Sequence, residues 1–170
     1  SHFKGQSLIL QFTATPFRED GKPLDGKIIY VYPMRQAQSE GYFKPIRFSS
    51  VYAFNSARAD RDIAEKAIEE LHADTTGLHV VMARVSTQAR ATEVHAIYEA
   101  LGQFNPVVIH SGLKETEIDA ARTKLKSGES RIVICVDMLG EGFDMPELKI
   151  AAFHDLRKSL AVTLQLAGRF

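Results

Sequence analysis

From Asp60 to the end of the chain, short apolar segments alternate with segments that have helical periodicity. Within the apolar segments the hydrophobic residues are continuous, which is typical of strands that are buried on both faces. Such strands occur in parallel sheets that helices cover on both sides. We therefore predict an α/β fold, a doubly wound parallel sheet with helices on both faces, from about Ser49 to residue 170. The expected strands are LHVVMAR (78–84), PVVIHSG (106–112), RIVICV (131–136) and LKIAAF (148–153).

Four helices are expected around these strands, because each of four segments carries one apolar stripe at helical spacing. They are DRDIAEKAIEELHA (60–73), TQARATEVHAIYEALG (87–102), KETEIDAARTKLKSG (114–128) and SLAVTLQLAG (159–168). Asp60 or Asp62 is a suitable N-cap for the first helix, since a carboxylate accepts hydrogen bonds from first-turn amides. Gly102 and Gly128 are expected to end the second and third helices. The expected core-facing residues are Ile63, Ala67, Ile68, Leu71, Ala91, Val94, Ile97, Leu101, Ile118, Ala121 and Leu125.

The first 48 residues have a different pattern and are expected to form an arm. SLILQFTATP (7–16) and IIYVY (28–32) have strand-like composition, and IRFSSVYAF (46–54) is also rich in β-forming residues. PMRQAQSEGYFKP (33–45) begins and ends with proline and has room for one short helix. The first of these strands has no βα partner of its own in this chain, so its apolar edge would attract other strands.

The segment GKPLDGKI (21–28) comes within one residue of the nucleotide-binding P-loop pattern, G-x-x-x-x-G-K followed by Ser or Thr. A working P-loop leads from a strand into a helix whose amides face the phosphates, and its hydroxyl binds magnesium. Ile28 has no hydroxyl, and the β-branched and aromatic residues that follow it do not favour a helix. Pro23 removes an amide and Asp25 adds an anion, and both oppose phosphate binding. We therefore interpret this segment as a turn.

Composition and charge exclude several classes of function. Lys and Arg together number 21, as do Asp and Glu, so the formal net charge is zero and any nucleic-acid contact must be local. The single cysteine, Cys135, allows no internal disulfide and lies in an apolar run, which fits a reducing, cytoplasmic setting. No segment reaches the roughly 20 apolar residues of a membrane span. The sequence also has no zinc-type Cys/His cluster, and no metal site is expected. It has no G-x-S-x-G elbow and no paired Cys and His for nucleophilic catalysis.

Four short stretches follow one another along the chain: TATPFREDG (13–21), HSG (110–112), VDMLGEGFDMP (136–146) and QLAGR (165–169). In this order they resemble the later motifs of superfamily 2 helicases, closest to the DEAD/DEAH group and type III restriction-type motor subunits. The resemblance covers nearly the whole chain and implies a RecA-like fold, two copies of which clamp ATP between them. It implies that residues 1–48 are the tail of the first RecA-like domain plus a linker. Residues 49–170 are then the second RecA-like domain, which ends inside motif VI.

The resemblance implies an ATP-facing set of residues after the strand RIVICV and near residue 170. Gly142 would let the backbone approach a phosphate closely. Asp144 would meet the ribose or order the interface, and Glu141 is a further candidate. Gln165 would order the γ-phosphate and the attacking water, and Arg169 would stabilise charge on the phosphoryl oxygens. ATP and Mg²⁺ are expected only in an intact two-domain parent, and neither is expected to be bound to this fragment.

The same resemblance assigns residues to coupling and to the nucleic-acid backbone. Thr13 and Thr15 would couple the state of ATP to domain closure. Loops that follow two of the strands would contact a single strand of DNA or RNA, because hydroxyls and backbone amides are suitable donors to phosphate. Val136 stands where many relatives carry a threonine that contacts a phosphate, which argues against that contact here. The residues expected at the backbone are Arg84, Ser86, His110, Ser111 and Gly112.

The resemblance thus implies the C-terminal motor domain of an ATP-dependent nucleic-acid helicase or translocase, a hydrolase acting on ATP. Its expected partners are a nucleic-acid backbone and the first RecA-like domain, and not a membrane. The chain by itself is expected to be inactive, because it lacks the P-loop, the acidic magnesium motif and the last arginine. The strand pattern alone leaves an alternative open: a Rossmann-like ligand- or protein-binding module without ATPase activity, since strand-end loops are generic ligand sites.

Overall fold

The computed structural model describes residues 9–13, 22, 25–42, 46–53, 55–136 and 145–155. Its elements are α1 (Met34–Ser39), α2 (Ser56–Ala73), β1 (Val80–Val85), α3 (Gln88–Ala100), β2 (Val107–Ile109), α4 (Glu115–Lys126), β3 (Ile132–Val136) and β4 (Leu148–Phe153). From α2 onward this is the expected alternation of helices and strands. The helix expected over 159–168 lies outside the described residues. Among the helices that the structure describes, none has the length and apolar content to cross a membrane.

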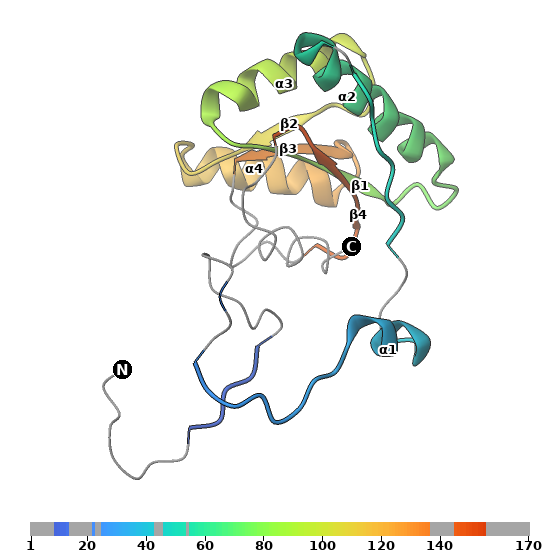
Figure 1. The fold of residues 1–170 in the computed structure, drawn as a ribbon. Coiled ribbons are helices and arrows are strands. Elements are labelled where there is room, and N and C mark those ends of the chain that lie inside the picture. The colour runs from blue at the N-terminus through green and yellow to red at the C-terminus, as the bar shows by residue number, and fades with distance from the viewer. Residues whose placement is uncertain are drawn as a thin grey trace.

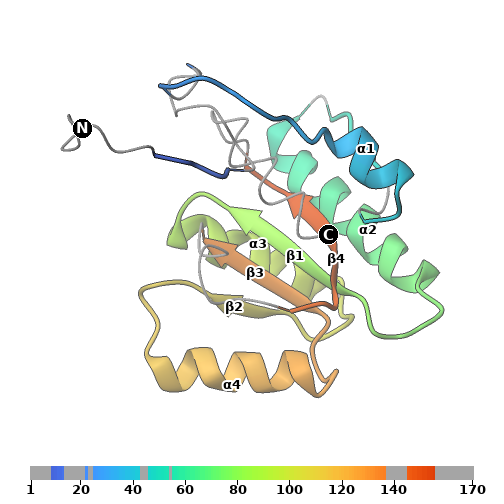
Figure 2. The ribbon, with the colours of Figure 1, turned by 90° about the horizontal axis from the view of Figure 1, so that it is seen from below.

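The four strands form one parallel sheet in the order β2-β3-β1-β4. β1 lies in the interior of this sheet, with β3 on one side and β4 on the other (Figures 1 and 2). Because every pairing is parallel, the carboxyl ends of all four strands lie at the same edge. This is the edge at which open α/β sheets bind their ligands.

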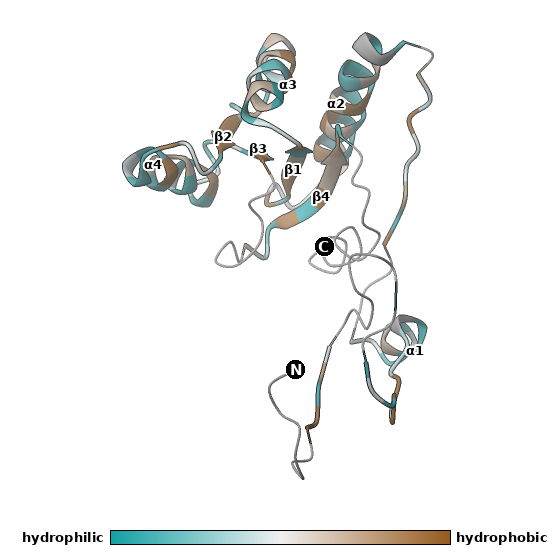
Figure 3. Ribbon diagram, turned by 60° about the vertical axis from the view of Figure 1, so that its left-hand side comes forward, coloured by the Kyte–Doolittle hydropathy of each residue, from teal (hydrophilic) through white to brown (hydrophobic). Residues whose placement is uncertain are grey.

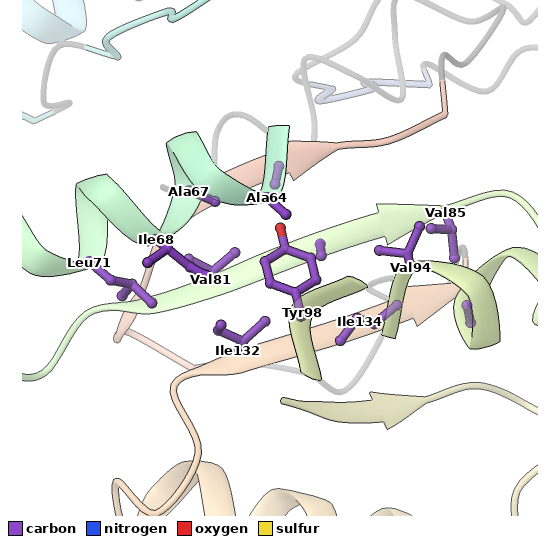
Figure 4. Packing of buried hydrophobic residues seen from close by; sticks show 13 residues of the cluster. Ala64, Ala67, Ile68, Leu71, Val81, Val85, Val94, Tyr98, Ile132 and Ile134 are labelled. Carbon is purple, nitrogen blue, oxygen red and sulfur yellow. The ribbon is translucent and has the colours of Figure 1, made fainter. Parts of the chain in front are cut away.

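Helices cover both faces of the sheet, with α2 and α3 on one face and α4 on the other (Figures 1 and 2). The α2–α3 face is lined by Val81, Ala83, Val85, Ile132 and Ile134 (Figure 4). The residues that alternate with them along the two strands line the α4 face: Val80, Met82, Val133 and Cys135. This alternation buries both faces of β1 and β3, which is why their sequences are apolar except for Arg84. The doubly wound α/β fold is therefore confirmed.

The helical stripes pack as the sequence predicted, and every expected core-facing residue lies in or against one of the two cores. Tyr98 of α3 was not among them, yet its side chain is completely buried. Gly102 and Gly128 follow α3 and α4 with φ of +68° and +77°, the left-handed conformation that glycine adopts readily. These two helix ends are therefore confirmed.

The start of α2 differs from the expectation that Asp60 or Asp62 is its N-cap. The helix begins one turn earlier, at Ser56, so both aspartates lie inside it. Asp60 is only 8% exposed, and its carboxylate binds Arg90 and His154. A tertiary contact, and not a helix end, is the physical reason for an aspartate at this position.

In the part of the arm that the structure describes, the expected strands are not present. Residues 9–13, 28–32 and 46–53 belong to no helix or strand, and their large apolar side chains include Phe12 at 87% and Ile29 at 72% exposure. β-forming composition is not sufficient, because a strand also needs a neighbour with which to exchange hydrogen bonds. The short helix expected within 33–45 is confirmed as α1, and it lies apart from the sheet (Figures 1 and 3).

The described part of GKPLDGKI agrees with its interpretation as a turn. Asp25 and Gly26 lie in a bend, and Gly26 has a φ of +128°. Residues 27–33 then form no helix, so nothing here resembles a strand–loop–helix phosphate site.

Candidate functional site

The carboxyl edge of the sheet brings together several of the residues expected at a ligand site. Ser86 follows β1 directly, and His110 follows β2 directly. The next strand, β3, ends at Val136, and β4 is followed by His154 and Asp155. Residues that are far apart in sequence therefore meet at one edge because the strands are parallel.

At this edge the Asp155 carboxylate accepts both polar hydrogens of Ser86. The Ser86 amide donates to Oδ2 at 2.8 Å and the Ser86 hydroxyl donates to the same oxygen at 2.7 Å. The Nε of Arg90 donates to the other oxygen, Oδ1, at 3.2 Å. Ser86 is exposed, but its donors point at this carboxylate. The loop after β1 is therefore fixed to the end of β4.

Arg84 occupies a position that does not fit its expected role at a nucleic-acid surface. It lies within β1 and is 3% exposed. Its guanidinium donates through Nη1 to the carbonyl of Asp155 at 2.8 Å, and its own carbonyl accepts from the amide of His154 at 3.1 Å. A buried side chain adds no charge to the surface. Arg84 instead stabilises this edge of the sheet by binding the residues that follow β4.

His110, Ser111 and Gly112 form the loop between β2 and α4. The Gly112 amide donates to Nδ1 of His110 at 3.1 Å, which closes the loop on itself, and Ser111 is exposed. A Cβ on Gly112 would lie 2.7 Å from Nε2 of Gln88, so the missing side chain lets Gln88 of α3 lie against this loop. The loops after β1 and β2 are thus neighbours, and Gln88 is a polar residue of this surface that sequence reasoning missed.

A buried polar network lies beneath these loops, and sequence reasoning missed it as well. Nη2 of Arg90 donates to both oxygens of Asp60, at 2.9 and 2.7 Å, and Nη1 donates to Glu93 at 2.7 Å. Nδ1 of His154 lies 3.0 Å from Asp60, and Nε2 lies 3.2 Å from the hydroxyl of Tyr98. Figure 4 shows that hydroxyl directed toward α2. Because a carboxylate only accepts, Nδ1 of His154 carries the proton and the Tyr98 hydroxyl donates to Nε2.

Burial and charge set the protonation of this network. Burial lowers the pKa of His154, and the nearby Asp60 opposes this effect only in part. Burial alone would raise the pKa of Asp155, but the hydrogen bonds from Ser86 and the charge of Arg90 hold it below its usual value. Hydrogen bonds to Glu93 and Asp60 raise the pKa of Arg90. At neutral pH the network therefore contains a neutral imidazole at His154, a guanidinium at Arg90 and an ionised carboxylate at Asp155.

The remaining expected site residues are Thr13 and six residues that lie outside the described ranges. Thr13 is exposed, in a segment that belongs to no helix or strand. In the part of the chain that the structure describes, no group of three or more His, Cys, Asp or Glu side chains is arranged to hold a metal ion. The residues that lie outside the described ranges are Thr15, Glu141, Gly142, Asp144, Gln165 and Arg169.

A surface hollow lies elsewhere, near the C-terminal ends of α3 and α4. Its lining includes Glu99, Gln103 and Lys124, with Val107 at the start of β2. None of the expected site residues lines it. The hollow is therefore at the amino end of a strand, away from the carboxyl edge.

Comparison with known proteins identifies the domain. The model of the helicase conserved C-terminal domain matches residues 62–170, more than half of the chain. DEAD-box ATP-dependent RNA helicase 15 of Arabidopsis thaliana is 27% identical over 96 residues, which cover 56% of this chain and 22% of the plant protein. UvrABC system protein B of Chlamydia muridarum is 30% identical over 113 residues, 64% of this chain and 16% of the bacterial protein. The chain thus spans 22% or less of the length of these curated relatives.

Among solved structures, S. cerevisiae Dbp5 bound to RNA and ADP BeF3 matches with a TM-score of 0.51 and 16% identity. The match covers 82% of this chain and 39% of the yeast chain. At this identity the likeness concerns the fold alone, and it agrees with a RecA-like α/β domain. The match of the family model over residues 62–170 shows that this chain belongs to the family of the helicase conserved C-terminal domain.

Proposed function

We propose that this chain is the second motor domain of an ATP-dependent nucleic-acid helicase or translocase. The family match over residues 62–170 carries this proposal, and the meeting of the strand-end loops at one edge supports it. The match favours a motor over a Rossmann-like binding module without ATPase activity, because one relative is an ATP-dependent RNA helicase. Since the chain spans a small part of that relative, the activity belongs to a longer protein in this proposal.

In the proposed parent protein, ATP and Mg²⁺ lie between this domain and a first RecA-like domain. Glu141, Gly142 and Asp144 follow β3 along the chain, and they would face the nucleotide from the carboxyl edge. Gln165 would orient the attacking water, and the Arg169 guanidinium would bind phosphoryl oxygens, where negative charge accumulates during transfer. Mg²⁺, when bound, neutralises phosphate charge.

The nucleic-acid backbone, of DNA or RNA, would cross the loops that follow β1 and β2. The exposed Ser111 supplies a hydroxyl donor, and His110 and Gly112 shape the same loop. Phosphate contacts of this kind fix a strand without reading its sequence. A few local donors are enough, so a chain with zero net charge is compatible with this role. In the matched yeast structure, RNA is bound to a protein of similar fold.

Residues 1–48 form, in this proposal, the tail of the first RecA-like domain and the linker. Thr13 and Thr15 would couple the state of ATP to closure of the two domains. The exposed apolar residues 28–32 support this assignment, because the rest of a first domain would cover them.

Replacing Arg169 by alanine in the full-length protein tests the proposal. We expect ATP hydrolysis to fall at least a hundredfold, a typical effect of removing a group that stabilises transition-state charge. Binding of a single-stranded oligonucleotide is expected to be largely retained, since Arg169 faces the nucleotide. Lys126→Ala, at the end of α4, is a control that should change neither property. Unchanged turnover in Arg169→Ala would remove this residue from the ATP site.

A further inference from the structure

We propose that Asp155 is the positioning residue that holds the nucleic-acid-binding edge in its working geometry. Asp155 is not among the residues that the helicase-like motifs single out. This inference rests on the proposed function, because it concerns the same surface of the loops after β1 and β2.

Asp155 joins three parts of the edge through its own atoms. Its carboxylate accepts from the amide and hydroxyl of Ser86 and from Nε of Arg90, and its carbonyl accepts from Arg84. Ser86 begins the loop after β1, Arg90 lies in the first turns of α3, and Arg84 belongs to β1 itself. One residue after β4 therefore fixes the end of β1 and the start of α3 together.

The support behind Asp155 is rigid because it is largely buried and made of charged hydrogen bonds. The Asp155 side chain is 19% exposed and that of Arg90 is 28% exposed. Arg90 is held in turn by Asp60 from α2 and by Glu93 from its own helix. Charge-assisted bonds of this kind are short and directional, so they restrict the loop to one arrangement. The start of α3 is further fixed by Thr87, whose side chain accepts from the Arg90 amide at 3.2 Å.

The fixed position of α3 extends to the second loop through Gln88. Its side chain lies against Gly112, where a Cβ would be only 2.7 Å away from Nε2. Gln88 and Ser111 are both exposed, so a ligand can reach the side chain of each. One lies at the start of α3 and the other in the loop after β2, and these two segments lie against each other. Movement of the start of α3 would therefore displace this whole surface.

The same geometry changes the role of Ser86. A hydroxyl has one hydrogen, and here it is donated to a carboxylate that would repel a phosphate at the same place. Ser86 is thus an anchor for its loop and not a direct phosphate donor. The strand would contact the neighbouring exposed groups, whose positions depend on the Asp155 anchor.

The test measures binding of fluorescein-labelled oligothymidylate and oligouridylate to the full-length protein by fluorescence anisotropy, over a series of salt concentrations. Asp155→Asn is expected to weaken binding about tenfold, which corresponds to loss of one well-placed charge-assisted contact. The slope of log Kd against log salt should stay that of the wild type, because the displaced donors are neutral and release no counterions. A purely structural loss of stability would lower the folded fraction and leave the Kd of the folded protein unchanged. The two oligonucleotides distinguish a DNA strand from an RNA strand.

Asp74→Asn is the matched control at the other edge of the sheet. Asp74 precedes β1, its side chain is 1% exposed, and it accepts from Arg131 at 2.7 Å. The substitution therefore breaks the same kind of carboxylate–guanidinium contact far from the proposed surface. We expect its salt slope and its affinity for both oligonucleotides to equal those of the wild type.

Ser86→Ala provides a second variant that keeps the Asp155 carboxylate and its contact with Arg90. We expect about threefold weaker binding, the effect of one neutral hydrogen bond. The double variant should bind no more weakly than Asp155→Asn, because both changes act through the same contact. If Asp155→Asn does not fold, an unchanged affinity of Ser86→Ala would overturn the proposal.

The outcomes separate this inference from the proposed function. If the wild type binds and Asp155→Asn binds with the same affinity, the role of Asp155 is overturned and the motor function still stands. Additive effects in the double variant would also overturn it, because they would make Ser86 an independent contact. Failure of the wild-type protein to bind either oligonucleotide would overturn the proposed function and this inference with it.

Discussion

Replacing Asp60 by asparagine tests whether the buried network stabilises the domain. Asp60 lies inside α2 and accepts from Arg90 at 2.9 and 2.7 Å and from His154 at 3.0 Å. Asparagine has nearly the same shape, but it carries no negative charge, and its amide nitrogen cannot accept a hydrogen bond. At least one N–H group of Arg90 or His154 therefore loses its acceptor while it stays in the protein interior.

The expected loss of stability follows from the exposure of the partners. Breaking a fully buried ion pair costs about 3–5 kcal/mol, because the remaining charge is left uncompensated. The Arg90 side chain is 28% exposed and keeps Glu93 and Asp155, which reduces this cost. We therefore expect Asp60→Asn to lower the free energy of unfolding by about 2 kcal/mol.

Urea unfolding of the purified chain, followed by far-UV circular dichroism, measures this loss. With a slope of about 2 kcal/mol per molar urea, the midpoint should fall by about 1 M. Asp62→Asn is the control on the same helix: its partner Arg58 lies 3.3 Å away and is 78% exposed. Such an exposed pair contributes about 0.3–0.5 kcal/mol. If Asp60→Asn unfolds at the same urea concentration as Asp62→Asn, the reasoning about the network is refuted.

Two further predictions concern pH and the core. Burial lowers the pKa of His154 from its ordinary value of about 6.5, so the unfolded chain binds a proton more readily than the folded chain. The stability that the neutral imidazole contributes is therefore fully present above about pH 6.5 and is lost as the pH falls below this value. Urea midpoints measured between about pH 7.5 and 5.5 should therefore fall more in the wild type than in His154→Asn, and equal falls would exclude His154 as the cause. Ile134→Ala should lower the free energy of unfolding by about 3 kcal/mol, because Ile134 is completely buried between the sheet and α3. Ile29 is 72% exposed, so Ile29→Ala should change the free energy of unfolding by less than about 0.5 kcal/mol. Equal urea midpoints for the two alanine variants would contradict the assigned core.

The sheet and its helices could be predicted because their burial is periodic in sequence. Residues of β1 and β3 contact α2 and α3 on one side and α4 on the other, so these strands are apolar except for Arg84. Gly102 and Gly128 mark helix ends because left-handed backbone favours glycine. These are local signals, and each depends on a few neighbouring residues only.

The arm could not be predicted in the same way. Residues 28–32 have β-branched and aromatic side chains, yet they form no strand, because pairing depends on a neighbour that the composition of the segment does not specify. The start of α2 was also misplaced. Asp60 resembles an N-cap by residue type, and only the positions of Arg90 and His154 explain why it lies inside the helix.

At the candidate site, the sequence located the loops but not the contacts between them. Ser86, His110 and Ser111 follow strands as expected, whereas the bonds of Asp155 connect residues that are nearly 70 positions apart. One signal was available for the network. Asp60 shares the apolar stripe of α2 with Ala64, and a charged residue on a buried stripe predicts a buried partner.

The central claim is that this chain supplies one half of an ATP site that is completed by a first RecA-like domain. It is tested most directly by measuring Mg²⁺-dependent ATP hydrolysis by the full-length protein and by the 170-residue chain, each with and without a single-stranded oligonucleotide. We predict turnover that the oligonucleotide stimulates in the full-length protein, and none above background in the isolated chain. Robust Mg²⁺-dependent turnover by the isolated chain would contradict the account.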